Sequence, residues 1–433
     1  MVRVTRKRFG LATVPLSLLV SVLLAVSACG GAGQDTSGGG GKAGAPGNTA
    51  GFDGKTIKLG ILTPLSGTVA VIGQPLTAGN EVWFDAVNAK GGIGGKYKVE
   101  LVQEDTQYKS DVAVQQYNKI KNDVVAFTQI LGTAPTLAVL PQLRTDKILA
   151  APASLDALWV REENLLPIGG PYQVQAINAM DYYLTDGGGS KDSRICTMIQ
   201  DDVYGEAGQQ GIDFAAEKYG FKVANTQKFK VGTENYAGQI GALAGARCEF
   251  VFLVATPSDA AKIWGTAAQA RFAPQWIGQS PSYTGALAQS AVAPYMQQRV
   301  LIAAEGTEWG DESVPGMKQM VGDMAKFAPN GKPDYYFGFG YNQGRAMTAV
   351  LEKAVELGDL SRDGILKASE QIGTVNFEGL SGDYKYGKAA DRNPPRATTI
   401  FKVDPAKPFG LAKVKYLLES DAAKQFEFKK ADL

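Results

Sequence analysis

The sequence predicts an α/β protein with two doubly wound, Rossmann-like lobes and an interlobe cleft. Apolar runs of strand length alternate along the chain with longer stretches whose apolar residues recur at helical spacing. This alternation is typical of a parallel sheet with helices on both faces, and most of the strand-like runs are apolar on both sides, as such burial requires. The alternation occurs twice, from Thr56 to Ala151 and from Arg194 to about Ala304, which indicates two similar lobes.

Each expected strand is a short apolar run, and Gly, Pro, Asn or Asp marks most of the joints between elements. In chain order the expected strands are Thr56–Leu62, Tyr97–Val102, Val124–Leu131, Lys147–Ala151, Arg194–Gln200, Phe221–Phe229, Cys248–Ala255, Gln275–Ile277 and Val300–Ala304. The expected helices between them are Leu76–Ala89, Ser110–Lys121, Gln173–Leu184, Glu206–Tyr219, Asn235–Ala244 and Ser258–Ala270. Helical patterns resume in Ser313–Phe327, Tyr336–Leu357 and Ser361–Ile372, and short antiparallel strands are expected in Phe377–Tyr384 and Thr398–Val403.

The part of the chain after the N-terminal region is longer than one hydrophobic core usually serves, so two domains are expected. We expect lobe 1 to comprise residues 52–170 and 308–372, and lobe 2 to comprise residues 171–307 and 373–433. The chain would then cross between the lobes three times, near residues 160–175, 300–310 and 370–378.

The N-terminus has the anatomy of a secretory signal. Four basic residues, Arg3, Arg6, Lys7 and Arg8, precede a mostly apolar run from Leu11 to Val26. Small residues then lead to Cys29, a pattern that resembles a bacterial lipobox, in which the cysteine becomes the acylated first residue of the mature chain. The alternative is an ordinary secretory signal with a chance cysteine. We therefore expect residues 1–29 to be a lipoprotein signal peptide and Cys29 to carry the lipid.

The segment from residue 30 to residue 51 contains no aromatic and no large aliphatic side chain. Such a composition cannot bury enough surface to offset the entropy of ordering, so the sequence predicts a flexible Gly-rich linker. A membrane anchor followed by this linker would hold the folded body at the outer face of the cell membrane. Linkers of this composition also occur without an anchor.

Cysteine and histidine usage restricts the chemistry. With Cys29 assigned to the lipid, Cys196 and Cys248 remain in an exported, oxidising setting at the starts of two strand-like runs, which favours a disulfide over two buried thiols. The chain contains no histidine, which excludes Ser-His and Cys-His catalysis and every histidine metal site. No EF-hand-like spacing of acids occurs either. We expect neither an enzyme nor a metal or other cofactor.

The charge balance excludes another class of partner. The formal net charge is +1, and loss of residues 1–29, which carry four basic and no acidic side chains, changes it to −3. A net charge of −3 is too small to indicate nucleic acid as a partner.

Candidate binding residues follow the expected strands. Loops at the carboxyl ends of parallel strands present helix N-termini to a shared crevice, which suits a carboxylate. These loops contain, in chain order, Ser66, Thr133 to Thr136, Ala153 and Ser154, Tyr204, Thr256 and Ser280. For any one such loop, helix capping is the better explanation, but three loops from each lobe at equivalent strand ends favour a common cleft.

Several segments resemble those of a known family. They are Ile57–Gly67, Asn88–Gly95, Val102–Gln107, Asp201–Glu206 and Gly379–Tyr384. In order and spacing they are similar to the branched-chain amino-acid (Leu/Ile/Val-binding) family of type I periplasmic binding proteins, the solute-binding lipoproteins of ABC importers. The resemblance covers roughly residues 51–404.

The resemblance implies binding positions. The groups that hold the ligand carboxylate in the family fall on Pro135 and Thr136, with Thr133 and Ala134 beside them, and on Ala153 and Ser154. Its aromatic positions fall on Tyr204 and about Tyr336.

Three positions depart from the family pattern. Ser280 stands where an acid typically pairs with the ligand ammonium, and Thr256 and Ile72 stand at aromatic positions. Because a buried ammonium without a carboxylate is costly, a standard amino acid is not the expected ligand unless Asp202 or another acid substitutes.

The expected function is capture of a small carboxylate-bearing solute, an amino acid or a related organic acid or amide, by hinge closure outside the cell membrane. The resemblance implies ABC permease and ATPase subunits as partners, a membrane contact through the lipid anchor, and a monomer. The alternatives are a ligand-sensing receptor module of the same fold and an exported enzyme.

Overall fold

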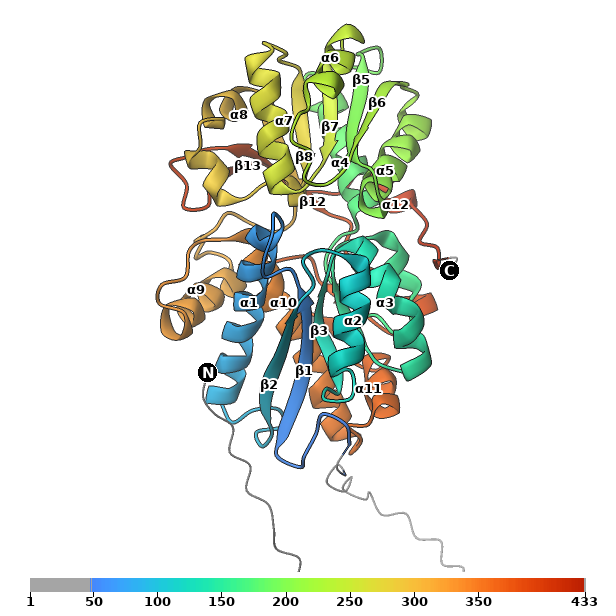
Figure 1. The fold of residues 1–433 in the computed structure, drawn as a ribbon, viewed down its shortest axis with the longest axis vertical. Coiled ribbons are helices and arrows are strands. Elements are labelled where there is room, and N and C mark those ends of the chain that lie inside the picture. Colours follow the sequence, from blue (N-terminus) through green and yellow to red (C-terminus); the bar gives the residue numbers. More distant parts are fainter. Residues whose placement is uncertain (1–46, 48, 432–433) are drawn as a thin grey trace, which may run out of the picture. The chain divides into compact units, whose positions relative to one another are not determined.

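The computed structural model describes residues 47 and 49–431. The expected signal peptide, Cys29 and most of the expected linker lie outside the described residues. The described chain forms two α/β lobes, each built on its own sheet (Figure 1). The predicted fold class is confirmed. No helix in this part of the chain combines the length and the apolarity needed to cross a membrane.

Lobe 1 contains a four-stranded parallel sheet in the order β2-β1-β3-β4. Its strands are β1 (Thr56–Thr63), β2 (Lys98–Asp105), β3 (Ala126–Leu131) and β4 (Ala150–Ala153). Its helices are α1 (Ala70–Ala89), α2 (Ser110–Ile120), α3 (Thr133–Asp146), α9 (Pro315–Phe327), α10 (Tyr335–Glu356) and α11 (Arg362–Ser369), with the short 3-10 turn η1 (Ala157–Arg161) after β4. One face of the sheet packs on α1 and α10 through residues such as Ile57 and Leu59, and the other packs on α2 and α3 through Leu62 and Phe127.

Helices α1 and α10 approach each other at backbone distance. A Cβ atom added at Gly340 would lie 1.8 Å from Leu76 O, and one added at Gly79 would lie 2.0 Å from Phe337 O. Only glycine fits at such a crossing. Gly340 and, against the side chain of Trp83, Gly344 therefore serve helix packing.

Lobe 2 contains a seven-stranded mixed sheet in the order β13-β12-β9-β8-β7-β5-β6. Strands β5 (Ile195–Gln200), β6 (Val223–Phe229), β7 (Phe250–Val254), β8 (Gln275–Gln279) and β9 (Val300–Ala304) run parallel, whereas β12 (Thr398–Val403) pairs antiparallel with both β9 and β13 (Leu411–Leu418). Its helices are α4 (Tyr172–Thr185), α5 (Val203–Tyr219), α6 (Ala237–Gly245), α7 (Pro257–Gln269), α8 (Ala293–Arg299) and α12 (Asp421–Gln425), with 3-10 turns η2 (Ser280–Ser282) and η3 (Gly285–Gln289).

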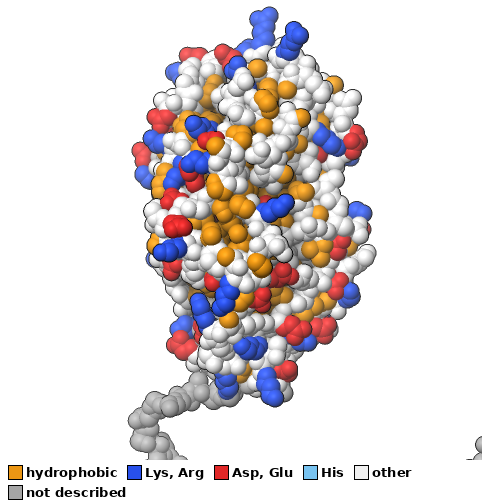
Figure 2. All heavy atoms as spheres, turned by 90° about the vertical axis from the view of Figure 1, so that its left-hand side faces the viewer, with side chains coloured by type: hydrophobic (Ala, Val, Ile, Leu, Met, Phe, Trp, Pro, Cys, Tyr) orange, Lys and Arg blue, Asp and Glu red, His pale blue; other side chains and the backbone are white. Residues whose placement is uncertain are grey.

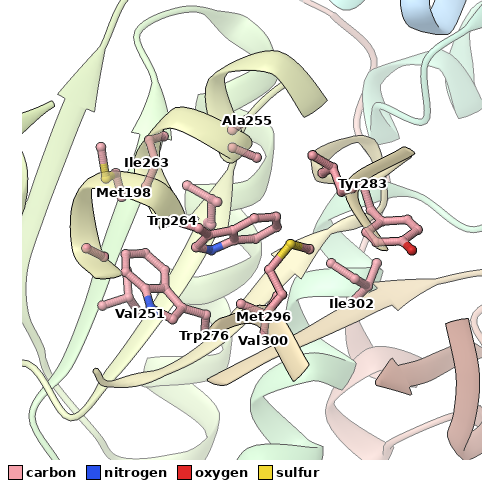
Figure 3. Close-up of a cluster of buried hydrophobic side chains, with 14 of the residues drawn as sticks. Met198, Val251, Ala255, Ile263, Trp264, Trp276, Tyr283, Met296, Val300 and Ile302 are labelled. Carbon is pink, nitrogen blue, oxygen red and sulfur yellow. The ribbon is translucent and has the colours of Figure 1, made fainter. Parts of the chain in front are cut away.

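Each face of the lobe 2 sheet has its own core. Helices α4 and α5 cover one face, and α6, α7 and α8 cover the other. On the second face, Trp264 and Trp276 are fully buried beside Val251 and Met296 (Figure 3). In this layer the sulfur atoms of Cys196 and Cys248 are bonded as a disulfide, beside the pairing of β5 with β7.

The third crossing lies later in the chain than expected. We expected lobe 2 to resume at residue 373, but the hairpin of β10 (Thr374–Val375) and β11 (Tyr384–Lys385) belongs to the core of lobe 1. Phe377 and Tyr384 are fully buried there, which holds the hairpin on that lobe. After the turn η4 (Ala389–Asp391), the chain reaches lobe 2 where Asn178 Nδ2 of α4 donates to Arg396 O at 2.8 Å.

Candidate functional site

A cavity lies between the two lobes at the carboxyl ends of their parallel strands. The space inside it that the centre of a water-sized sphere can reach is about 50 Å³. Lobe 1 and lobe 2 both supply its walls. The lining residues are Ile72, Leu76, Tyr108, Leu131, Gly132, Thr133, Ala153, Ser154, Leu155, Tyr172, Tyr204, Thr256, Ser280, Pro281, Tyr335, Tyr336 and Phe339. We call this space the interlobe cavity.

The N-terminus of α3 opens into this cavity without a capping side chain. Its N-cap is Gly132, whose φ of 102° suits glycine, and the first turn contains no acidic residue. Thr133 is 1 % exposed, and its Oγ1 has no hydrogen-bond partner within residues 47 and 49–431. Unpaired N–H groups at a helix N-terminus carry partial positive charge, so this end of α3 is suited to an anion such as a carboxylate.

Ser154 provides a second hydroxyl at the same end of the cavity. Its Oγ accepts a hydrogen bond from Trp159 Nε1 at 3.0 Å, which fixes the oxygen and leaves its own proton to donate. Thr136 behaves differently. Its Oγ1 donates to Ile130 O at 3.3 Å, so this hydroxyl points back to β3 and does not line the cavity.

Tyrosine rings form much of the remaining wall. Tyr172 and Tyr204 lie with ring centroids 4.9 Å apart, and Tyr336 comes from the first turn of α10. Burial raises the pKa of Tyr204 and of Tyr336 well above the usual range, so both hydroxyls stay neutral. These rings present apolar faces to a ligand.

No ionisable acid or base lines the interlobe cavity among the residues that the structure describes, apart from tyrosine. Asp202, the candidate substitute for an ammonium-pairing acid, instead caps α5: its Oδ1 accepts from the N–H groups of Tyr204 and Gly205 at 3.0 and 3.1 Å. Asp259 is likewise engaged, accepting from Tyr236 OH at 2.7 Å. Ser280 lines the cavity and carries no charge, so a buried ammonium would lack a partner here.

Contacts between the lobes close over the cavity. Ser258 Oγ, at the start of α7, donates to Thr68 O of lobe 1 at 2.9 Å. Tyr336 OH of α10 donates to Tyr283 O of lobe 2 at 2.8 Å. Both contacts depend on the angle between the lobes, so a ligand that binds both walls would favour this closed arrangement.

The structure brings together most of the residues expected from the sequence. Thr133, Ala153, Ser154, Tyr204, Thr256, Ser280 and Tyr336 all line the cavity, whereas Ser66, Ala134, Pro135 and Thr136 do not. Ser66 instead orders its own loop, where its Oγ donates to Asp105 Oδ2 at 2.5 Å.

Sequence reasoning omitted several other lining residues, chiefly Tyr108, Tyr172, Tyr335 and Phe339. The signal for the last two was present, because Tyr335 and Phe339 are four residues apart and share one face of a helix. Tyr108 lies in a loop after β2 with a φ of 61°, and nothing in the pattern of residues predicts where such a loop places its side chain.

Comparison with known proteins assigns the family. A family model described as "Periplasmic binding protein" matches residues 56–408. Among curated relatives, the Leu/Ile/Val-binding protein homolog 3 of Brucella melitensis is 25% identical over 200 residues, covering 45% of this chain and 53% of the relative. The leucine-, isoleucine-, valine-, threonine- and alanine-binding protein of Pseudomonas aeruginosa is 24% identical over 212 residues, again 53% of its length. The chain thus matches about half the length of these relatives.

Solved structures agree over a longer part of the chain. A fatty acid ABC transporter substrate-binding protein from Thermomonospora curvata has a TM-score of 0.83 and 26% identity, and the match covers 89% of this chain and 98% of that one. A branched-chain amino acid ABC transporter protein from Thermus thermophilus with bound valine has a TM-score of 0.73 at 15% identity, covering 86% of this chain and 98% of the other, and so shows the fold alone. The chain therefore belongs to the periplasmic binding protein family and has the type I fold of ABC-transporter substrate-binding proteins.

Proposed function

We propose that this chain is the extracytoplasmic solute-binding component of an ABC importer and that its ligand is an amphipathic carboxylate of the fatty acid class. The observation that carries the proposal is the combination of an uncapped helix N-terminus with apolar and tyrosine walls that contain no carboxylate for an ammonium group. The ligand would place its carboxylate at Thr133 and Ser154 and its hydrocarbon chain against the rings.

The anionic end is supported by the donors that meet there. Among the described residues the hydroxyl of Thr133 has no partner, and no side chain caps the first N–H groups of α3. A buried polar group without a partner is unfavourable by about 1–3 kcal/mol. A carboxylate would satisfy several of these donors at once, and hydrogen bonds to a charged group contribute about 1.5–3 kcal/mol each. A neutral hydrocarbon would leave the donors unpaired.

The absence of an ammonium site is supported by Ser280 and Asp202. Removing an ion from water costs several kcal/mol unless a partner compensates it. Ser280 has no charge, and Asp202 Oδ1 already accepts two backbone hydrogen bonds. We therefore rank leucine, isoleucine and valine below unaminated acids as ligands. The 26% identity to a protein named for fatty acid transport agrees with this order.

The transport role depends on closure and on anchoring. A ligand that contacts α3 of lobe 1 and Tyr204 of lobe 2 makes the angle between the lobes depend on whether the site is occupied. A permease can then distinguish the loaded protein from the empty protein by this angle. We propose that Cys29 carries the lipid that retains the protein at the membrane, that the protein acts as a monomer, and that it catalyses no reaction.

Calorimetry with four ligands tests the proposal. Decanoate, the keto acid of leucine, leucine and valine are titrated separately into the delipidated protein. We expect decanoate to bind most tightly and the keto acid to bind at least as well as leucine. Decylammonium is the control, because it has the same chain with the opposite charge and should not enter the interlobe cavity. Tight binding of leucine or valine with no response to decanoate would refute the proposed ligand class.

A further inference from the structure

A second cavity adjoins the interlobe cavity and shares two of its walls, Tyr335 and Phe339. The space inside it that the centre of a water-sized sphere can reach is about 50 Å³. It lies where the chain leaves β9 and enters α9, and Phe409 of lobe 2 and Met320 of lobe 1 both contribute to it. Hydrophobic side chains gather where the two lobes meet on the face that carries α1 and α9 (Figure 2). We call this space the hinge cavity.

One buried acceptor in the hinge cavity lacks a donor, and a buried carboxylate beside it has a single one. Asn342 is 3 % exposed, and its Oδ1 has no hydrogen-bond partner among the residues that the structure describes. Glu305 is 6 % exposed; Oε1 accepts the N–H of Gly170, and no second hydrogen bond to this carboxylate occurs within the described residues. Buried acceptors are normally paired, so Asn342 Oδ1 and the second oxygen of Glu305 could each accept from a ligand where the described residues offer no donor.

The electrostatic surroundings favour a cation. No Lys or Arg lines the hinge cavity in the described part of the chain, and a second acid, Asp334, does. Burial raises the pKa of Glu305 to about 8 and that of Asp334 to about 7. The ionisable groups nearest to Glu305 among the described residues include two tyrosines, Tyr172 and Tyr335, which are not basic. Burial raises the pKa of both tyrosines, and the negative charge of Glu305 adds to this rise. A positive ligand that displaced the proton of Glu305 would supply the counter-charge of the ionised carboxylate.

The walls also suit an organic cation better than a metal ion. Trp309, Phe339 and Phe409 line the cavity, and aromatic faces attract ammonium groups and pack on alkyl chains. Metal ions such as Ca²⁺ need six or more oxygen ligands, whereas no group of three or more His, Cys, Asp or Glu residues is arranged to hold a metal within residues 47 and 49–431.

We propose that the hinge cavity binds a primary alkylammonium ion. Its N–H donors would pair with Glu305 and Asn342 Oδ1, and its alkyl group would lie against Trp309 and Met320. Because Glu305 and Phe409 belong to the lobe 2 side and Met320 and Asn342 to lobe 1, an occupied hinge cavity stabilises the closed arrangement of the lobes. The proposal is independent of which ligand occupies the interlobe cavity.

Calorimetry with propylammonium on the full chain tests this site. We expect saturable binding whose affinity rises with pH, by about tenfold per unit below about pH 8, because the cation must displace the proton of Glu305. Two probes are controls for chemistry: propionate has the opposite charge, and tetramethylammonium has no N–H donor. Both should bind at least tenfold more weakly. Equal binding of propionate, or no binding of propylammonium at ~10 mM, would overturn the proposal.

Variants assign the site. Glu305→Gln should lower the affinity at least tenfold and remove the pH dependence, whereas Asn342→Leu should lower the affinity and keep the pH dependence. The matched control is Glu312→Gln, in the same connection but exposed and outside the cavity, which should bind as the parent does. If Glu305→Gln fails to fold, the propylammonium affinities of Asn342→Leu and Glu312→Gln alone decide whether the site is in the hinge cavity. Equal affinities in these variants, or competition between decanoate and propylammonium for one site, would show that no separate ammonium site exists.

Discussion

Replacing Thr133 by Val should weaken carboxylate binding, whereas the same replacement at Thr136 should not. The two residues lie one turn apart on α3, and both are essentially buried. Val keeps the shape of Thr and removes only the hydroxyl. Thr133 lines the cavity, and its Oγ1 has no partner among the described residues, whereas Thr136 Oγ1 already donates to Ile130 O.

The expected magnitudes follow from these contacts. Loss of one hydrogen bond to a carboxylate removes about 1.5–3 kcal/mol, so decanoate should bind the Thr133→Val variant about 10- to 150-fold more weakly. In the unliganded protein the same change removes an unpaired buried hydroxyl, so the free energy of unfolding should stay equal or rise. Thr136→Val breaks a hydrogen bond at 3.3 Å, and it should lower the free energy of unfolding by about 0.5–1 kcal/mol without changing affinity.

The assay combines calorimetric titration with urea unfolding for the parent and both variants. The signature is a crossed pattern: affinity falls only in Thr133→Val, and stability falls only in Thr136→Val. A larger affinity loss in Thr136→Val would refute the assignment of the carboxylate to the first turn of α3. Equal losses in both would show that the packing of the helix matters and the hydroxyl does not.

The remaining predictions concern charge, covalent links and pH. Ser280→Asp should weaken decanoate binding by about 1–3 kcal/mol because it buries a second negative charge, and calorimetry on an equally stable variant measures this loss. Cys29→Ser should move the protein from the membrane to the soluble fraction without changing its affinity; a variant that still partitions with detergent would disprove the anchor. Reduction of the bond between Cys196 and Cys248, whose sequence separation is 52, should lower the free energy of unfolding by at most ~4 kcal/mol; two reactive thiols in denatured, unreduced protein would contradict the disulfide. The native protein keeps the proton of Glu305 up to about pH 8, whereas the unfolded chain releases it near 4.5, so stability should fall as pH rises between these values, by up to about 1.4 kcal/mol per unit. Glu305→Gln should flatten this decline in thermal unfolding scans, and an unchanged slope would place the titration elsewhere.

The fold could be predicted because strand and helix patterns alternate in a simple order along the sequence. Once the strands are assigned, their carboxyl ends identify the position of the cleft between the lobes. The same reasoning could predict Thr133, Ser154 and Ser280 as site residues, because each lies one or two residues after the end of a strand. The side of a helix that a hydroxyl faces was not predictable, which explains why Thr136 was grouped with Thr133. The lobe to which the β10–β11 hairpin belongs was not predictable either, because two-residue strands carry almost no periodicity and burial of Phe377 in the core of lobe 1 decides it.

The glycine crossing of α1 and α10 determines what kind of molecule the interlobe cavity can select. Both helices supply cavity walls, through Leu76 on one and Phe339 on the other, and their separation is fixed by backbone contact at Gly340. Backbone atoms cannot adjust by changing rotamer as side chains do. The lobe 1 half of the cavity is therefore preorganised and rigid in width. Such a wall discriminates by cross-section, so branching close to the carboxylate should be excluded more strongly than added length along a straight chain.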